Sequence, residues 1–196
     1  YFANLNPEGQ FDNLESVTNE VKLMMDPNAD PYAVPAPDAN AVPAKFGASD
    51  IQDLNWVQLM NAYTCTECGR CTSSCPANIT GKKLSPRKIM MDTRDRMEEV
   101  GRNIDANKGV FVPDNKSLLN DYITPEELWA CTSCNACVEE CPVNISPLSI
   151  IIDMRRYLVM EQSAAPTSLN VMMSNIENNG APWQYSQLDR LNWKNE

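Results

Sequence analysis

The sequence of 196 residues contains no histidine, and this absence removes several kinds of site. Histidine-ligated haem, a Rieske centre and a Cys/His zinc finger each need an imidazole nitrogen as a ligand, so all three are excluded. The side chain that most often serves as a general base near neutral pH is also missing. Chemistry that depends on a histidine base is therefore not expected.

Long apolar runs are missing as well. The longest apolar stretch, near residues 150–152, is interrupted by Asp153, Arg155 and Arg156. A membrane-spanning helix needs roughly 18 or more consecutive apolar residues. We therefore expect no transmembrane segment in this chain.

Positive charge is scarce: 16 Lys and Arg stand against 26 Asp and Glu, and the formal net charge is −10. Without a basic stripe to displace the counterions of a phosphate backbone, a nucleic-acid partner is not expected. An acidic protein of this kind tends to dock on basic patches of protein partners.

Cysteine, in contrast, is arranged in a repeated pattern, C-x2-C-x2-C-x3-C-P, that uses all eight copies. The first group is Cys65, Cys68, Cys71 and Cys75, and the second is Cys131, Cys134, Cys137 and Cys141. The two-residue spacing lets three thiolates wrap one face of a cube of iron and sulfide, while the intervening backbone amides donate hydrogen bonds to sulfur. We therefore predict two 4Fe-4S clusters as cofactors.

The fourth cysteine of each group lies beyond that wrap. In two-cluster ferredoxins with this run, the fourth cysteine ligates the other cluster. The predicted ligands are Cys65, Cys68, Cys71 and Cys141 for the first cluster and Cys131, Cys134, Cys137 and Cys75 for the second. No cysteine is left over, so we predict no catalytic nucleophile and no catalytic residue in this chain.

Two alternative uses of clustered cysteines are a disulfide framework and structural zinc. Zinc sites usually pair two C-x2-C units into one tetrahedral set. Neither alternative accounts for a third cysteine at the same spacing and a Cys-Pro step in both groups. The pattern therefore favours iron–sulfur ligation.

The repetition continues beyond the cysteines. Residues 75–79 match residues 141–145, and residues 86–94 match residues 147–155, with a short insertion near Gly81 in the first copy. A duplicated unit predicts two half-sites related by a pseudo-twofold axis.

Helix signals surround both groups. Ser85-Pro86 and Ser146-Pro147 each place an N-cap before a proline at the first helical position, which predicts helices to about Val100, capped by Gly101, and to about Met160. Residues 124–127 form a capping box that predicts a short helix carrying Trp129 toward Cys131. A lead-in helix over residues 49–62 is predicted from a stripe of four apolar side chains, Ile51, Leu54, Val57 and Met60. The predicted fold class is therefore all-α rather than the short-stranded fold of small bacterial ferredoxins.

These signals divide the sequence into three regions. Residues 1–48 are expected to hold an amphipathic helix over 11–25 and a Pro-rich extended arm, and residues 49–162 the two-cluster domain. Residues 163–196 are expected to hold a helix over 165–180 and a tail, whose apolar residues either contact another subunit or pack on their own core.

Several large side chains near the cysteines have two interpretations. Trp56 and Trp129 either shield the clusters from water or simply pack, and packing is the usual role of a tryptophan on a helix. Met90, Met91 and Met97 are interpreted as core residues rather than as ligands.

The two cysteine groups, together with the Pro-x-x-Ile-x-x-Asp-x-Arg segment after each, resemble the iron–sulfur subunits of heterodisulfide reductase and related Fe-S oxidoreductases. Residues 177–183 also look like a Glu-x-x-Gly-Asn-Pro-Trp segment of that family, with Ala181 in place of the asparagine. The resemblance covers residues 49–183. It implies an α-helical ferredoxin domain, which is also found in the iron–sulfur subunits of succinate dehydrogenase and fumarate reductase.

The same resemblance implies redox protein partners, a place at the cytoplasmic face of a membrane and, in membrane-linked members, a quinone-connected membrane or flavin subunit. Two departures limit it. This sequence lacks the adjacent cysteine pair of the catalytic cysteine-rich domain, so that chemistry is expected on a separate polypeptide, and no cysteine precedes Cys65 to form a plant-type 2Fe-2S domain.

The sequence thus predicts an electron-transfer component of an oxidoreductase. Three other hypotheses are a catalytic subunit with substrate at one cluster, a metal-stabilised structural or interaction module, and an iron–sulfur subunit like that of succinate dehydrogenase.

Overall fold

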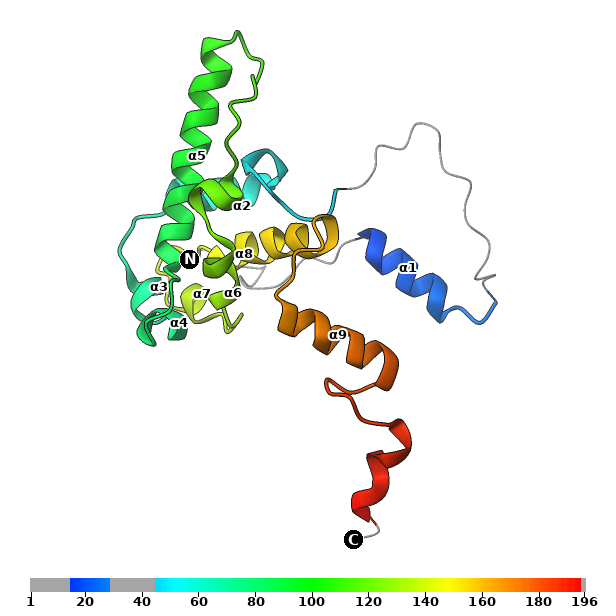
Figure 1. Cartoon of the computed structure of the whole chain (residues 1–196). Coiled ribbons are helices and arrows are strands. Elements are labelled where there is room, and N and C mark those ends of the chain that lie inside the picture. Colours follow the sequence, from blue (N-terminus) through cyan, green and yellow to red (C-terminus); the bar gives the residue numbers. More distant parts are fainter. Residues whose placement is uncertain (1–14, 29–44, 195–196) are drawn as a thin grey trace. The chain divides into compact units, whose positions relative to one another are not determined.

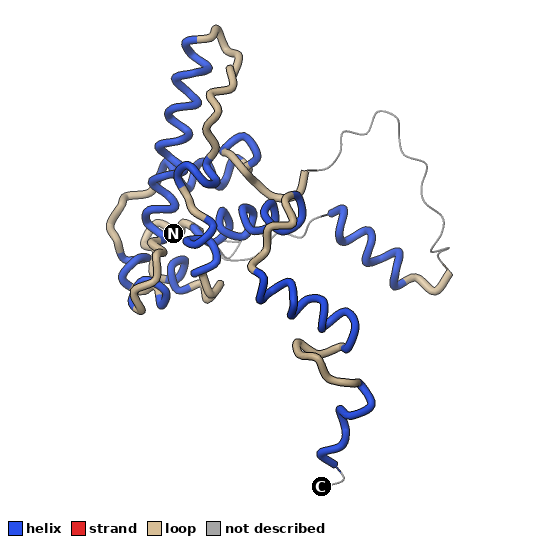
Figure 2. The backbone as a smooth tube through the Cα atoms, viewed as in Figure 1, coloured by secondary structure: helices blue, strands red, loops and turns tan. Residues whose placement is uncertain are grey.

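The computed structural model describes residues 15–28 and 45–194 (Figure 1). Over these ranges the chain consists of helices and loops, with no strand longer than the single bridge between Leu119 and Ile123 (Figure 2). The predicted all-α fold class is confirmed. The chain divides into two compact units, residues 1–157 and residues 158–196.

Helix α1 (Glu15–Met25) belongs to the predicted amphipathic segment. Its Val17, Val21 and Met24 are exposed. The start of the predicted helix, residues 11–14, and most of the predicted arm, residues 29–44, lie outside the described residues. None of the helices in the described ranges has the length and hydropathy that a bilayer-spanning helix requires.

The core of the first unit is built around α5 (Pro86–Ala106) and α8 (Pro147–Arg156), which pack against each other. Helix α2 (Trp56–Thr64) packs on α5, and α6 (Pro125–Ala130) packs on α8. Helices α3 (Arg70–Ser73), α4 (Pro76–Ile79) and α7 (Ala136–Glu139) are single turns. Fully buried side chains from both copies of the sequence repeat fill the space between these helices: Ile89, Met90, Leu128, Leu148, Ile150, Ile151 and Met154.

The repeat predicted from the sequence is present in the backbone. In each half a lead-in helix ends at the first cysteine, a single-turn helix carries the third, and a long helix follows after a Ser-Pro step. The residues with a left-handed backbone conformation (positive φ) also correspond, because Glu67 and Gly69 in the first half match Ser133 and Asn135 in the second. The sequence duplication is therefore a structural duplication.

The helix starts are capped as predicted. Ser85 and Ser146 accept hydrogen bonds from the backbone N–H groups of Lys88 and Ser149. Thr124 and Glu127 form the reciprocal capping box at the start of α6. These caps satisfy backbone donors that would otherwise lack partners at a helix end.

The predicted end of α5 at Gly101 is wrong, because the helix continues to Ala106. A glycine inside a helix costs only about 1 kcal/mol relative to alanine. The extension has compensating contacts, since the Asn103 side chain hydrogen-bonds with the backbone N–H and C=O of Val112. This end of α5 and the loop that returns from it project from the rest of the unit (Figure 1).

The predicted lead-in helix over residues 49–62 is also partly wrong. A 3-10 turn at Ile51–Asp53 comes first, Leu54 is extended, and α2 starts only after Asn55. Asp50 and Asn55 each cap a helix start with their side chains, and such capping competes with a continuous helix. As a result Ile51 and Leu54 are buried, whereas Val57 and Met60 of the predicted stripe are exposed.

The two halves are joined by polar contacts that cross between them. The Gln58 side chain, in the capping box of α2, donates to Asp153 of α8 at 2.6 Å. In the matching place of the other half, Lys88 of α5 pairs with Glu127, in the capping box of α6, at 2.8 Å and with Asp92 at 2.7 Å. Each long helix therefore holds the lead-in helix of the opposite half.

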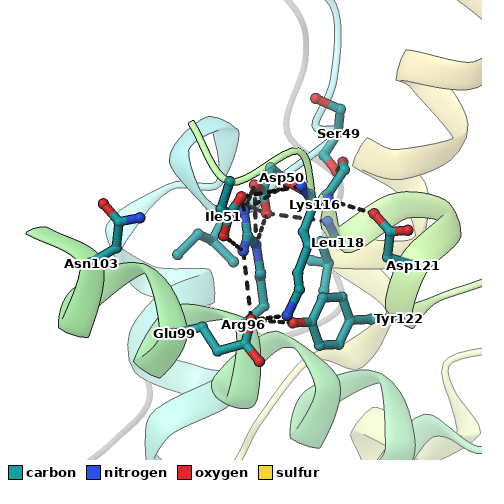
Figure 3. Close-up of polar contacts among 12 residues, drawn as sticks. Ser49, Asp50, Ile51, Arg96, Glu99, Asn103, Lys116, Leu118, Asp121 and Tyr122 are labelled. Carbon is teal, nitrogen blue, oxygen red and sulfur yellow. Dashed lines mark hydrogen bonds and ion pairs between the residues drawn. The ribbon is translucent and has the colours of Figure 1, made fainter. Parts of the chain in front are cut away.

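A buried arginine anchors the loop that returns from α5. The Arg96 guanidinium, fully buried, binds Asp50 at 2.7 Å and donates to the carbonyl of Lys116 at 2.8 Å (Figure 3). It also pairs with Asp114, whose pKa it lowers to about 2. One side chain therefore joins three segments that are distant in the sequence.

The second unit contains α9 (Thr167–Asn179), which Gly180 ends with a left-handed residue at φ 65°. The predicted helix over residues 165–180 is confirmed. A helical turn at Tyr157–Glu161 follows α8 directly, and the boundary between the two units falls within it, after Tyr157. A 3-10 helix occupies Gln187–Lys194. Among the apolar residues predicted to form contacts, Met173, Ile176 and Trp183 are exposed.

Candidate metal centres

Each cysteine group lies in a loop held between helices. Cys65 follows α2 and Cys131 follows α6, in both cases as the C-cap residue. Cys71 lies in α3 and Cys137 in α7, and Cys75 is the N-cap of α4. The helix ends thus fix the start and the end of each loop.

The eight thiols border two cavities. The first cavity is lined by Cys65, Cys68, Cys71 and Cys141, with apolar side chains from Met90, Val143 and Ile145. The second is lined by Cys75, Cys131, Cys134 and Cys137, with Leu148 and Ile151. The first cavity thus contains the four cysteines predicted for the first cluster, and the second contains the four predicted for the other. Cys137 borders both cavities.

The thiols influence each other within these groups. Burial raises the pKa of Cys71, and the nearby Cys65 and Cys141 raise it further. Burial likewise raises the pKa of Cys131, to which Cys75 and Cys134 add. The pKa of Cys137 is raised to about 12, by burial first and then by its cysteine neighbours. A positive metal must therefore replace these protons if the sulfurs are to become thiolates.

Backbone amides of the loops point at sulfur. The N–H of Ser133 donates to Cys131 Sγ at 3.4 Å, and the N–H of Ile145 donates to Cys141 Sγ at 3.3 Å. Ser133 takes a left-handed conformation at φ 55° to do so. Such N–H···S bonds are the second-sphere contacts that stabilise thiolate ligands.

The residues fit an iron–sulfur cube. All eight cysteines, each of them in the described part of the chain, are free thiols and none forms a disulfide. Across residues 15–28 and 45–194, no three cysteine or carboxylate side chains converge on the position of a single metal ion. The thiols of each set instead surround a cavity, which suits a bulky four-iron cube.

Two arginines near these loops were not assigned a role from the sequence. Arg155 binds the backbone of the second cysteine loop, and Arg94 pairs with Glu67 in the first. The available signal was their matching position at the end of the repeat, residues 86–94 and 147–155.

Trp129 lies under Arg155, whereas Trp56 is 71% exposed and does not pack in the core.

Comparison with known proteins agrees with this geometry. Residues 64–145 match the family model described as a 4Fe-4S dicluster domain. This part of the chain is therefore a two-cluster iron–sulfur domain, with two 4Fe-4S clusters as its cofactors.

Three similar proteins are named as oxidoreductases or as a subunit of a reductase. The chain is 36% identical over 180 residues to the probable iron-sulfur-binding oxidoreductase FadF of Bacillus subtilis, covering 77% of this chain and 25% of that protein. It is 34% identical over 169 residues to the EtfAB:quinone oxidoreductase of Syntrophomonas wolfei, covering 77% and 24%. It is 32% identical over 108 residues to one subunit of the ferredoxin/F(420)H(2)-dependent CoB-CoM heterodisulfide reductase of Methanosarcina acetivorans, covering 55% and 52%.

The resemblance to heterodisulfide reductase subunits and related Fe-S oxidoreductases is thus confirmed. The chain spans about a quarter of the length of the first two relatives and about half of the third.

Proposed function

We propose that this chain carries single electrons through two 4Fe-4S clusters inside a larger oxidoreductase. The observation that supports this function most directly is the grouping of the eight thiols into two sets, one at each cavity. When bound, each cluster supplies reversible one-electron chemistry. The protein supplies the ligands, the apolar walls that limit water and the amides that stabilise negative sulfur.

The ligands follow the crossed arrangement. Cys65, Cys68, Cys71 and Cys141 hold the first cluster, and Cys131, Cys134, Cys137 and Cys75 hold the second. Its support is that Cys141 lines the first cavity and Cys75 the second, each far in sequence from the other ligands of its set. Since Cys137 borders both cavities, the two sets lie side by side in the same unit.

The partners are redox proteins or further domains of the same oxidoreductase. The relatives' names suggest a quinone-linked oxidoreductase and a heterodisulfide reductase as the two models. The catalytic cysteine-rich domain and a membrane or flavin component are the partners that we propose, with the chain at the cytoplasmic face of a membrane. Purification of the native complex without oxygen should yield these components with the chain, and recovery of the chain alone would contradict the partner proposal.

The decisive test is iron and sulfide quantification combined with EPR of the dithionite-reduced protein, purified without oxygen. About eight iron atoms per chain and two interacting one-electron signals are expected. Clusters that bind but do not reduce reversibly would instead indicate a structural module.

The crossed ligation has its own test, the variant Cys75→Ser. We expect it to lose or convert the cluster held by Cys131, Cys134 and Cys137, with the other cluster retained in the EPR spectrum. Damage confined to the cluster of Cys65, Cys68 and Cys71 would contradict the crossing.

A further inference from the structure

Arg155 is a part-buried cation at the second cysteine loop. Its guanidinium donates to the carbonyl of Leu128 at 2.6 and 3.0 Å, to the carbonyl of Cys131, and to the Ser133 hydroxyl at 3.4 Å. It also stacks over the Trp129 ring, 5.0 Å from the centroid. All these partners are uncharged, and in the described part of the chain no carboxylate lies within ion-pair distance of it.

The guanidinium and the sulfur of Cys131 attract each other. Burial lowers the pKa of Arg155, and attraction to the Cys131 thiolate opposes that shift. An arginine nevertheless stays charged at neutral pH. The second loop therefore lies against a full positive charge that, among the described residues, no carboxylate within ion-pair distance neutralises.

The matching arginine of the first half is neutralised. Arg94 pairs with Glu67 at 2.6 Å, and Glu67 lines the first cavity at the position that Ser133 occupies in the second half. Arg87 also lines the first cavity, but it is exposed, so the high dielectric constant of the surrounding water weakens the effect of its charge. Among the described residues that line the second cavity, the cysteines are the ones with an ionisable side chain.

We propose that Arg155 raises the reduction potential of the second cluster above that of the first, so that the first electron to enter the domain resides on the second cluster. The reason is electrostatic, since reduction adds one negative charge and a nearby uncancelled cation stabilises it in a medium of low dielectric constant. The inference rests on the proposed function and ligand sets.

The test is a redox titration of the full chain holding both clusters, followed by EPR without oxygen. In Arg155→Gln, we expect the higher midpoint to fall so that the reduced-to-oxidised ratio at a fixed ambient potential drops about tenfold, which for a one-electron couple is about 59 mV. Arg155→Lys keeps the positive charge, so its higher midpoint should fall by less than half as much as in Arg155→Gln.

Three further variants separate charge from structure. Ser133→Glu copies the first half by placing a carboxylate beside Arg155, and it should lower the higher midpoint without removing the arginine. Glu67→Gln removes a negative charge at the first cavity and should raise only the lower midpoint. This result would assign the lower midpoint to the first cluster and the higher midpoint to the second. The double variant Glu67→Gln/Arg94→Gln removes a neutral pair and should leave both midpoints nearly unchanged.

The inference is overturned if Arg155→Gln leaves the higher midpoint in place, or if Arg155→Lys shifts it as far as Arg155→Gln. If Arg155→Gln does not retain both clusters, Ser133→Glu decides, because an unchanged higher midpoint there also rejects the inference. The unmodified protein tests the proposed function separately, through its iron content and its two reversible waves.

Discussion

Arg96 shows at the scale of one residue how the first unit holds a long loop in place. Its side chain is fully buried between Asp50, Asp114 and the backbone of Lys116. A buried charge is stable only when its partners remain in place, because removal of one member leaves the others uncompensated. The network therefore depends on each of its members.

Replacing Arg96 with Met should lower the free energy of unfolding by about 3 kcal/mol, at the low end for a broken buried pair because both aspartates are partly exposed. For a chain of this size, the Tm of the anaerobically purified protein should fall by roughly 6–12 °C. Arg102→Met is the matched control, since Arg102 pairs with Glu98 on the exposed side of the same helix. Equal melting of the two variants would reject the buried role of Arg96.

The buried thiols make cluster assembly depend on pH. Because the pKa of Cys137 is raised to about 12, its sulfur carries a proton in the metal-free chain at neutral pH. Iron binding must release that proton, so the apparent affinity for iron should rise by about tenfold per pH unit for each such thiol between pH 7 and 9. Anaerobic reconstitution followed by absorbance measures this, and a yield that does not change with pH would contradict it.

The gathering of the eight cysteines into two sets could be predicted from their spacing, because three thiolates at two-residue intervals have few other uses, and their assignment as cluster ligands stays a prediction. The roles of Arg96 and Arg155 could not be predicted, because their partners lie 46 and 27 residues away in the sequence. Contacts of that kind depend on how the helices pack, and a local pattern does not encode them.

At the scale of elements, Gly47 sets how closely the chain before α2 approaches α8. It has φ +76°, and a Cβ atom there would lie 2.2 Å from the carbonyl oxygen of Asp153 and 2.5 Å from the backbone N of Tyr157. The neighbouring Ala48 N–H donates to the same carbonyl at 3.0 Å. Only glycine fits between these backbone atoms.

Gly47→Ala should destabilise the protein by roughly 2–4 kcal/mol, from left-handed strain and a backbone clash that no side-chain movement relieves. Gly81→Ala is the control, because Gly81 has φ +80° with open space around it and should lose only about 1–2 kcal/mol. Urea unfolding of the two variants measures the difference. A Gly47→Ala variant as stable as Gly81→Ala would show that the approach is not tight.

The helix starts were predictable and some helix ends were not. Ser85, Ser146 and Thr124 are local signals whose caps form within three residues. The end of α5 depends on the contact of Asn103 with Val112, a loop position nine residues away, so Gly101 alone did not decide it. Likewise, the break between residues 53 and 55 arises because Asp50 and Asn55 each cap a separate helix start, which competes with one continuous helix.

At the scale of the whole molecule, we expect the cysteine loops to depend on the clusters for order. Helices α3, α4 and α7 have four residues each, far below the length at which an isolated helix is stable. Removal of iron should therefore abolish hydrogen-exchange protection in residues 65–79 and 131–145 first, while α5 keeps its protection longer. Mass spectrometry of iron-loaded and iron-free protein measures this, and equal protection of the loops in both would refute it.

The crossed polar contacts have an evolutionary consequence. Besides its capping bond within its own half, Gln58 donates to Asp153 on α8 and Glu127 pairs with Lys88 on α5, so neither half can make these additional bonds by itself. A precursor with a single copy of this unit could have made these bonds only by pairing with a second copy of itself. The matching segments of the two halves are what a duplication of such a self-pairing unit would leave, and Glu67 and Ser133 mark a position at which the two copies differ.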